Sequence, residues 1–317
     1  MKYQDEEKLH NFKKVDEIIS SLPEYTRVFF EAMENKNMSE RSVVQYAYDI
    51  SRFYGWLNGR DINELSIEDV NEYLRTLYYS ENSDPADVKM TSPAFRARKA
   101  SSLRSYLKYM HRIGYLKQGL AELIDLPKVP EKHIVTLDEN DIARLLDVCK
   151  NKRDYTVTLL FLATGIRVSE LVGLDIKDCD LENDSIIVRR KGGNEAEVYF
   201  GQQLHSALLE YLTARKTVVC DCPALFLSNR NQRMAVRTVQ YMIKHNAELA
   251  NVNTKATPHA FRRSFATSLY DKSNDIYLVS EALGHSSVET TRKHYAKQDA
   301  KRMKEKLSHY SDDIIKG

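Results

Sequence analysis

Apolar residues recur every three or four positions through the first part of the chain, which is the period of an amphipathic helix. One such stretch runs from Val43 to Leu57, and Gly59, just beyond it, is a helix stop signal. Another stretch begins with Ser66 and Asp69, which have the spacing of an N-terminal capping box. These patterns predict a bundle of helices.

The segment 97–114 predicts a helix with two different faces. Arg104, Lys108 and Arg112 recur at intervals of four residues and therefore share one side. Apolar residues at helical spacing occupy another side: Leu103, Tyr106, Leu107, Met110 and Ile113. A purely cationic helix face suits a phosphate backbone.

The second half of the chain mixes helices with a β-hairpin. Thr136 and Glu139 have the spacing of a capping box and predict a helix that opens there. Two β-prone runs flank the turn Gly192-Gly193-Asn194, which is a hairpin signal. After about residue 235 the apolar spacing is again helical.

A stretch with two prolines and no apolar period, residues 127–133, predicts an interdomain linker. It separates a helical domain over 21–126, preceded by a short helical extension over 1–20, from a larger domain over 134–317. The end of the larger domain predicts a C-terminal helix from apolar residues at helical spacing: Met303, Leu307, Tyr310 and Ile314.

Composition indicates a globular protein, with 42% hydrophobic and 29% charged residues. The sequence contains no apolar run of about 18 residues and no signal-peptide core at its charged N-terminus, so we expect no membrane partner. The cysteines show neither a disulfide framework nor a metal-ligand pattern: Cys149, Cys179, Cys220 and Cys222. We therefore expect a cytoplasmic protein with reduced thiols.

The net charge of +2 conceals a strong asymmetry along the chain. Residues 1–87 contain 10 Lys/Arg and 18 Asp/Glu, whereas residues 88–121 contain 8 Lys/Arg and no acidic residue. A solvated helix face is the ordinary interpretation of a charge run. A basic block without carboxylates favours nucleic acid instead, because it can displace counterions from phosphates.

Four segments of the second half contain residues suited to phosphoryl transfer. ATGIRVSELVGL precedes the hairpin turn RRKGGNE, and TPHAFRRSFATSL precedes LGHSSVETTRKHYA. Taken together, in order and spacing, these motifs resemble the signature of the tyrosine recombinase (phage integrase, Xer-like) family. The resemblance implies six catalytic residues: Arg167, Lys191, His259, Arg262, His285 and Tyr295.

The resemblance also implies a fold and an activity. The fold is mainly α, with an N-terminal SAM-like helical core-binding domain and a larger mixed α/β catalytic domain that contains a small antiparallel hairpin sheet. The activity is site-specific recombination of duplex DNA through a 3′-phosphotyrosine and a Holliday junction, by a dimer on each site and a tetramer in the synapse. No cofactor and no metal are implied. The family docks its C-terminal helix on a neighbouring protomer, although docking in cis stays open here.

The residue types fit this chemistry on physical grounds. Attack on a phosphodiester develops charge on the non-bridging oxygens, and guanidiniums bind such oxygens bidentately without losing their charge. Arg167 and Arg262 are the candidates. Thr257 and Pro258 predict the start of a helix, which places His259 and Arg262 on one face near its positive end.

The leaving group needs a proton donor, because a sugar alkoxide is nearly as basic as hydroxide. Lys191, with an ordinary pKa of about 10.4, is protonated at neutral pH and lies in the hairpin turn. The hairpin departs from the family pattern, since Asn194 and Ala196 stand where the family has further basic residues. This weakens the case for DNA contact by the hairpin itself.

Tyr295 is the expected nucleophile among 19 tyrosines. Ser286 and Glu289 have the spacing of a capping box, so a helix that begins after His285 would carry Tyr295. Family members commonly have one residue fewer in this interval, and the shorter position is His294 here. Because histidine cannot form a phosphotyrosine, the extra residue must be accommodated locally.

Further expectations concern orientation and DNA contact. Glu170, one turn after Arg167, either orients that arginine or is an exposed helix residue. We expect DNA contacts from six basic residues: Arg96, Arg98, Lys99, Arg104, Lys108 and Arg237. Two other functions remain open at this point, a type IB topoisomerase-like nicking-closing enzyme and a non-catalytic DNA-binding regulator.

Overall fold

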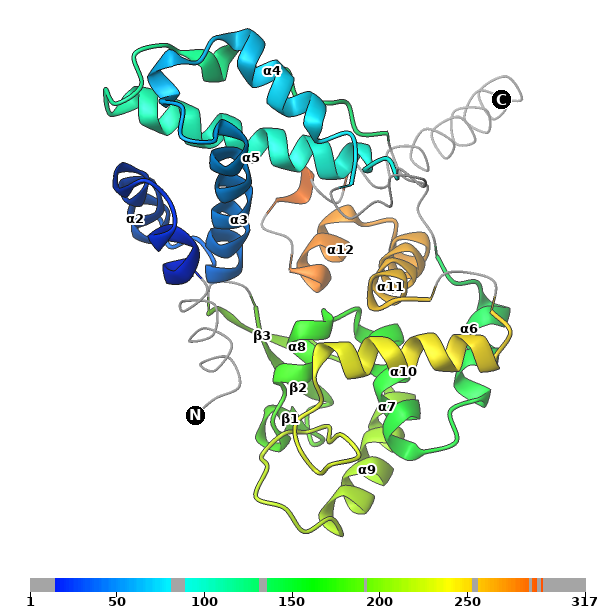
Figure 1. Ribbon diagram of the computed structural model, residues 1–317. Helices are drawn as coiled ribbons and strands as arrows, with labels where there is room; N and C mark the ends of the chain where they lie inside the picture. The colour runs from blue at the N-terminus through cyan, green and yellow to red at the C-terminus, as the bar shows by residue number, and fades with distance from the viewer. Residues whose placement is uncertain are drawn as a thin grey trace, which may run out of the picture. The chain divides into compact units, whose positions relative to one another are not determined.

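The chain divides into two units, Met1–Lys132 and His133–Gly317, and the division falls within the stretch predicted as a linker. The structure is a computed structural model (Figure 1). It describes seven stretches of the chain: residues 15–80, 89–130, 136–190, 193–252, 256–284, 287–289 and 292.

The first unit is helical, as the apolar spacing predicts. Its main helices are α2 (Arg27–Asn35), α3 (Glu40–Leu57), α4 (Ile67–Thr76) and α5 (Pro93–Arg112). Short 3-10 helices lie at Glu24–Thr26, Ile62–Glu64 and Leu120–Leu123.

Local signals define the ends of these helices. The capping box at the start of α4 is confirmed, with the Asp69 amide donating to Ser66 Oγ at 3.2 Å and the Ser66 amide donating to Asp69 Oδ2 at 2.9 Å. The expected stop at Gly59 is off by one residue. Asn58 already adopts the left-handed conformation at φ +49°, because asparagine tolerates that region better than most side chains.

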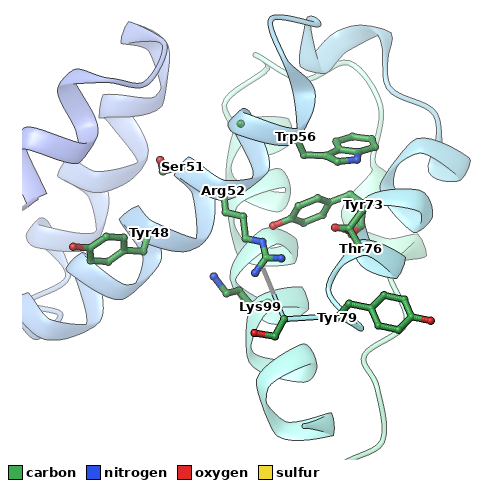
Figure 2. A pocket seen from close by; sticks show the side chains of 10 residues that line it. Tyr48, Ser51, Arg52, Trp56, Tyr73, Thr76, Tyr79 and Lys99 are labelled. Carbon is green, nitrogen blue, oxygen red and sulfur yellow. The ribbon is translucent and has the colours of Figure 1, made fainter. Parts of the chain in front are cut away.

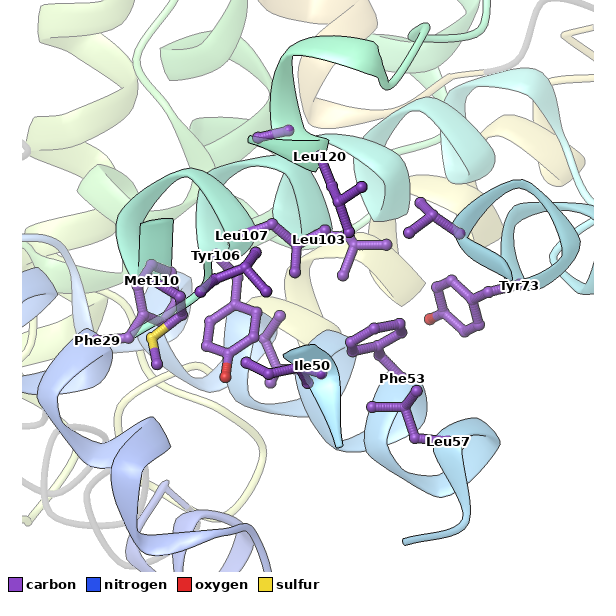
Figure 3. Packing of buried hydrophobic residues seen from close by; sticks show 14 of the residues in the cluster. Phe29, Ile50, Phe53, Leu57, Tyr73, Leu103, Tyr106, Leu107, Met110 and Leu120 are labelled. Carbon is purple, nitrogen blue, oxygen red and sulfur yellow. The ribbon is translucent and has the colours of Figure 1, made fainter. Parts of the chain in front are cut away.

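Large side chains from all four helices form the core of this unit (Figure 3). Ile50 and Phe53 of α3 and Tyr106 of α5 are fully buried. Val15 and Ile19 belong to the same core, so the part of the predicted extension that the structure describes packs on the bundle.

A buried carboxylate joins α3 to α5. Asp49 is 3% exposed and accepts hydrogen bonds from Arg98 Nη1 at 2.5 Å and Ser102 Oγ at 2.7 Å. Lys99 Nζ forms an ion pair with the same carboxylate at 2.8 Å. Buried charge is tolerated only when it is paired and hydrogen-bonded, and Asp49 has both kinds of partner.

The second unit combines helices with one small sheet. Its helices are α6 (Glu139–Asp147), α7 (Lys152–Thr164), α8 (Val168–Gly173), α9 (Gln202–Lys216), α10 (Val236–Leu249), α11 (Pro258–Ser273) and α12 (Ile276–Leu283), with a 3-10 helix at Ile176–Asp178. The mainly α fold with a mixed α/β second part is confirmed.

The sheet is antiparallel in the order β1-β2-β3. The predicted hairpin corresponds to β2 (Ser185–Arg189) and β3 (Glu195–Tyr199), in which Arg189 pairs with Glu195 next to the turn. A third strand, β1 (Cys179–Asp180), pairs with β2 and was not expected from its two residues.

The expected capping box at Thr136 and Glu139 is wrong. Asp138 caps α6 instead, and its Oδ1 accepts from the Asp141 amide at 2.7 Å. An aspartate is a stronger cap than a threonine, and its charge is favourable at the positive end of a helix.

Candidate active site and nucleic-acid interface

Arg167 lies at the turn between α7 and α8. Gly165 ends α7 with φ +61°, and a Cβ at this position would approach Phe265 Cδ1 to 2.3 Å, so the turn requires glycine twice over. The chain then extends through Arg167, the N-cap of α8.

Glu170 has the orienting role that the sequence left open. Its carboxylate is buried and accepts from the Arg167 amide at 2.7 Å and from Arg167 Nη1 at 2.8 Å. One acid therefore fixes both the backbone and the side chain of Arg167.

Helix α11 places the second arginine. Thr257 caps it as predicted, accepting from the Ala260 amide at 3.1 Å, and Pro258 occupies its first turn. Phe261 is buried and stacks on Phe161 of α7 with ring centroids 6.1 Å apart. This packing fixes the helix face that carries Arg262.

Arg262 is buried at 8% exposure and connects three helices. Its Nη1 donates to the Gly165 carbonyl at the end of α7 at 2.7 Å, and its Nη2 donates to the Leu283 carbonyl at the end of α12. The carbonyls at helix ends lack intrahelical partners and attract cations, so Arg262 meets two favourable acceptors.

Burial and nearby charges lower the pKa values of two groups on this helix, Arg262 and His259. Burial lowers the pKa of Arg262 to about 10, with a smaller contribution from the positive charge of Arg167. This pKa is well above neutral, so the guanidinium stays charged. Burial also lowers the pKa of His259, and three positive charges lower it further: Arg263, Arg262 and Arg167. His259 is therefore largely neutral at pH 7 and able to accept a proton.

The remaining predicted catalytic residues lie outside the described part of the chain. These residues are Lys191, His285 and Tyr295, and Ser286 and the C-terminal helix lie outside it as well. The structure thus brings together Arg167, His259 and Arg262.

The predicted DNA-binding residues of α5 differ in their surroundings. Lys99 is 8% exposed and forms an ion pair with Asp49. A side chain that contacts a phosphate must be accessible, so Lys99 is not placed for this role. Arg98 pairs with the same carboxylate, and the Arg98 side chain is 39% exposed. Arg96 donates to the Thr91 carbonyl at 2.5 Å and lies over the Tyr78 ring. We therefore reinterpret Lys99 as a structural residue of the bundle.

Two other basic residues of α5 are better placed for a nucleic acid. Arg104 is half-buried and Lys108 is exposed. Lys108 and Arg112 border a hollow of about 340 Å³ between α2, α3 and α5. Arg237, on α10 of the second unit, is also exposed.

A second groove of the first unit has a volume of about 670 Å³ and lies on a different part of its surface. It is bordered by aromatic rings, including Tyr48, Trp56 and Tyr79, and by the basic side chains of Arg52 and Lys99 (Figure 2). The Lys99 amine belongs to the Asp49 cluster, so the groove and the joint between α3 and α5 share one residue.

Two family models match the sequence. The model described as "Phage integrase family" matches residues 135–302, and the model described as "Phage integrase, N-terminal SAM-like domain" matches residues 27–97. The first alone covers more than half of the chain. The chain belongs to the phage integrase family.

Named relatives agree with this membership. The tyrosine recombinase XerC of Caldanaerobacter subterraneus subsp. tengcongensis is 32% identical over 277 residues, which cover 81% of this chain and 78% of that protein. The tyrosine recombinase XerD of Yersinia pestis is 31% identical over 268 residues, which cover 81% of this chain and 87% of that protein. This family member is a tyrosine recombinase.

Solved structures share the fold. The Tn1549 transposon integrase in complex with transposon right end DNA has a TM-score of 0.70 at 19% identity, covering 89% of this chain and 99% of that chain. The XerH site-specific recombinase bound to palindromic difH substrate has a TM-score of 0.66 at 21% identity, covering 87% and 82%. At these identities the likeness concerns architecture alone.

The sequence motifs did not single out Arg190, a basic residue that the structure places beside Arg262. The positive charge of Arg190 contributes to the lowered pKa of Arg262. Arg190 Nη2 donates to the Ala282 carbonyl at 3.3 Å. The run Arg189-Arg190-Lys191 was its only signal in the sequence, and that signal does not separate it from Arg189, which pairs with Asp178 at 2.7 Å.

Among the described residues, no helix is both long enough and apolar enough to cross a membrane. Within the same stretches, no three His, Cys, Asp or Glu side chains group in a way that could hold a metal ion. Independence from metal stays a prediction to be tested.

The electrostatics of α11 generate a prediction for the recombinase. Replacing Arg263 by glutamine removes the largest of the charges that lower the pKa of His259, so the pKa should rise. NMR titration of the imidazole, assigned with His259→Gln, measures the change. Lys272→Gln removes a charge from the last turn of the same helix and should leave the His259 pKa unchanged. An unaltered or lower pKa in Arg263→Gln would contradict this electrostatic account.

Proposed function

We propose that this tyrosine recombinase cuts one strand of a specific duplex site by attack of the Tyr295 hydroxyl on the scissile phosphorus. A bond forms between the tyrosine oxygen and phosphorus, and the bond to the 5′-oxygen breaks. The products are a 3′-phosphotyrosine and a free 5′-hydroxyl. Attack by a partner strand reverses the chemistry, and two such exchanges pass through a Holliday junction.

The observation that carries this proposal is the pair of fixed guanidiniums beside a neutral imidazole. Arg167 is held by Glu170, and Arg262 is held by two helix-end carbonyls. Five N–H donors on each guanidinium leave several free to bind non-bridging oxygens. Fixed donors need no reorganisation as charge develops, which is the main source of catalysis in phosphoryl transfer.

Proton movements complete the mechanism. His259, whose pKa is lowered, accepts the proton of the Tyr295 hydroxyl, whose ordinary pKa is about 10. Lys191 donates a proton to the leaving 5′-oxygen. His285 joins the site as the second histidine of the signature. The roles of Lys191, His285 and Tyr295 rest on the order and spacing of the sequence motifs.

The partner is double-stranded DNA with a defined target sequence. XerH and the Tn1549 integrase are named as bound to DNA, and the half-buried Arg104 and the exposed Lys108 and Arg237 of this chain suit the same partner. We infer a dimer on each site, a tetramer in the synapse and a cytoplasmic location. The names of the relatives favour recombination over topoisomerase-like nicking or a purely regulatory role.

Trapping on a nicked suicide duplex tests the nucleophile. The unaltered protein should remain covalently attached to the 3′ side, because release of the short 5′ fragment prevents religation. Tyr295→Phe should bind the same DNA without forming adduct, since phenylalanine has no nucleophilic oxygen. Tyr277→Phe removes an exposed hydroxyl of α12 and is the matched control.

Adduct formed by Tyr295→Phe at normal yield would refute the assignment. The reaction of the unaltered protein should also proceed in excess EDTA. A strict requirement for Mg²⁺ would refute a mechanism in which the two guanidiniums stabilise the phosphate charge without a metal ion.

The salt dependence of DNA binding tests the basic face of α5. Arg104→Ala and Lys108→Ala should each reduce the slope of log K against log salt by about one unit, because each removes one phosphate contact. Lys152→Ala should leave the slope unchanged, since Lys152 is already paired with Glu210 at 3.3 Å in the other unit. Unchanged slopes in both α5 variants would show that this face is merely solvated.

A further inference from the structure

The guanidinium of Arg190 packs directly on the backbone of Gly284. A Cβ added to Gly284 would lie 2.0 Å from Arg190 Nη1 and 2.2 Å from its Cζ, closer than any real Cβ contact. Gly284 also has φ +60°, a conformation that side chains other than glycine adopt at a cost. The positive φ favours glycine here, and any side chain at this position would also displace the Arg190 guanidinium from the backbone.

The same guanidinium reaches the end of helix α12. Its Nη2 donates to the Ala282 carbonyl at 3.3 Å, while Arg262 Nη2 donates to the next carbonyl, that of Leu283. The last carbonyls of a helix lack intrahelical partners and lie at its negative end. Two arginines thus share the C-terminal turn of α12, one from the end of β2 and one from α11.

Arg190 is costly to place in this way. Its Nε is buried without a hydrogen-bond partner among the described residues. It also brings a further positive charge close to Arg262, and this charge contributes to the lowered pKa of Arg262. A serine at position 190 would avoid both penalties, so we look for the benefit of the arginine in the segments that it holds in place.

We propose that Arg190 is a positioning residue of the recombination site, which fixes the turn after α12 against the end of β2 and beside Arg262. This inference rests on the proposed function. Arg190 immediately precedes Lys191 in the sequence, and Gly284 immediately precedes His285. One side-chain-to-backbone contact therefore ties together the two segments that lead into these two proposed catalytic residues.

The role predicts a loss of cleavage without a loss of binding. In single-turnover trapping on the suicide duplex, Arg190→Ala should form adduct on the order of 10²-fold more slowly, as expected when reacting groups are misplaced by about 1 Å. The DNA dissociation constant and the circular dichroism spectrum should match those of the unaltered protein. Arg190→Lys should recover little of the rate, because an ammonium keeps the charge but has no planar group to pack on Gly284.

A double-mutant cycle tests the contact itself. Gly284→Ala should slow adduct formation strongly in the unaltered background, where the new methyl group displaces the guanidinium. It should slow adduct formation less in Arg190→Ala, where only the backbone cost remains. Arg230→Ala removes an exposed arginine of the same unit and should leave the rate unchanged.

The outcomes separate this inference from the proposed function. If the unaltered protein forms no adduct with its target, the proposed function fails and the positioning role fails with it. If the unaltered protein forms adduct and Arg190→Ala does so at the same rate, the positioning role alone is overturned. Full recovery by Arg190→Lys, or strictly additive effects of the two substitutions, would also overturn it.

Discussion

The hydrogen bonds of the buried Arg262 guanidinium are the interactions on which the second unit depends. From α11 the guanidinium reaches the C-terminal carbonyls of both α7 and α12, so three helix ends converge on one charged group. Both acceptors are neutral, and they do not cancel the charge. The carboxylate of Glu170 raises the pKa of Arg262, whereas the positive charges of Arg167 and Arg190 lower it. The site therefore has an excess of fixed cations, which is the condition for stabilising the negative charge that develops on a phosphodiester during cleavage.

The first unit uses the same kinds of residue for a different purpose. Asp49 is one buried carboxylate between two basic side chains, Arg98 and Lys99, and their charges are used within the bundle. Removing Asp49 would leave the buried Lys99 ammonium without its counter-charge, which is far more costly than losing an exposed ion pair. Charge holds two helices together here, whereas around Arg262 the same physics leaves positive charge available for a substrate.

Most elements could be predicted from the sequence because their signals are local. The cap at Ser66, the start of α11 at Thr257 and the hairpin around Gly193 depend on residues a few positions apart. The start of α6 failed because two candidate caps, Thr136 and Asp138, lie two residues apart, and only their competition decides.

Contacts between residues far apart in the chain could not be predicted from the spacing of residue types in the sequence. The spacing of α5 places Lys99 four residues before Leu103, on the apolar face, and Lys108 on the opposite, exposed face, but it does not reveal that Asp49 is the partner of Lys99. Arg190 was likewise indistinguishable from Arg189, since its partners lie almost a hundred residues later in the chain. The motifs identified the arginines of the site, but only the fold shows which acceptors hold them.

The central claim is that the Arg262 guanidinium stabilises negative charge on the scissile phosphate. The most direct measurement compares adduct formation by the unaltered protein and Arg262→Ala on two substrates, an ordinary phosphodiester and one whose scissile group is a neutral methylphosphonate. On the phosphodiester, Arg262→Ala should be slower by about 10²–10³-fold, the usual loss for one oxyanion-stabilising donor. On the methylphosphonate this deficit should largely disappear, because the charge that the guanidinium compensates is gone. An equal deficit on both substrates would contradict the account and leave Arg262 as a structural link between helices.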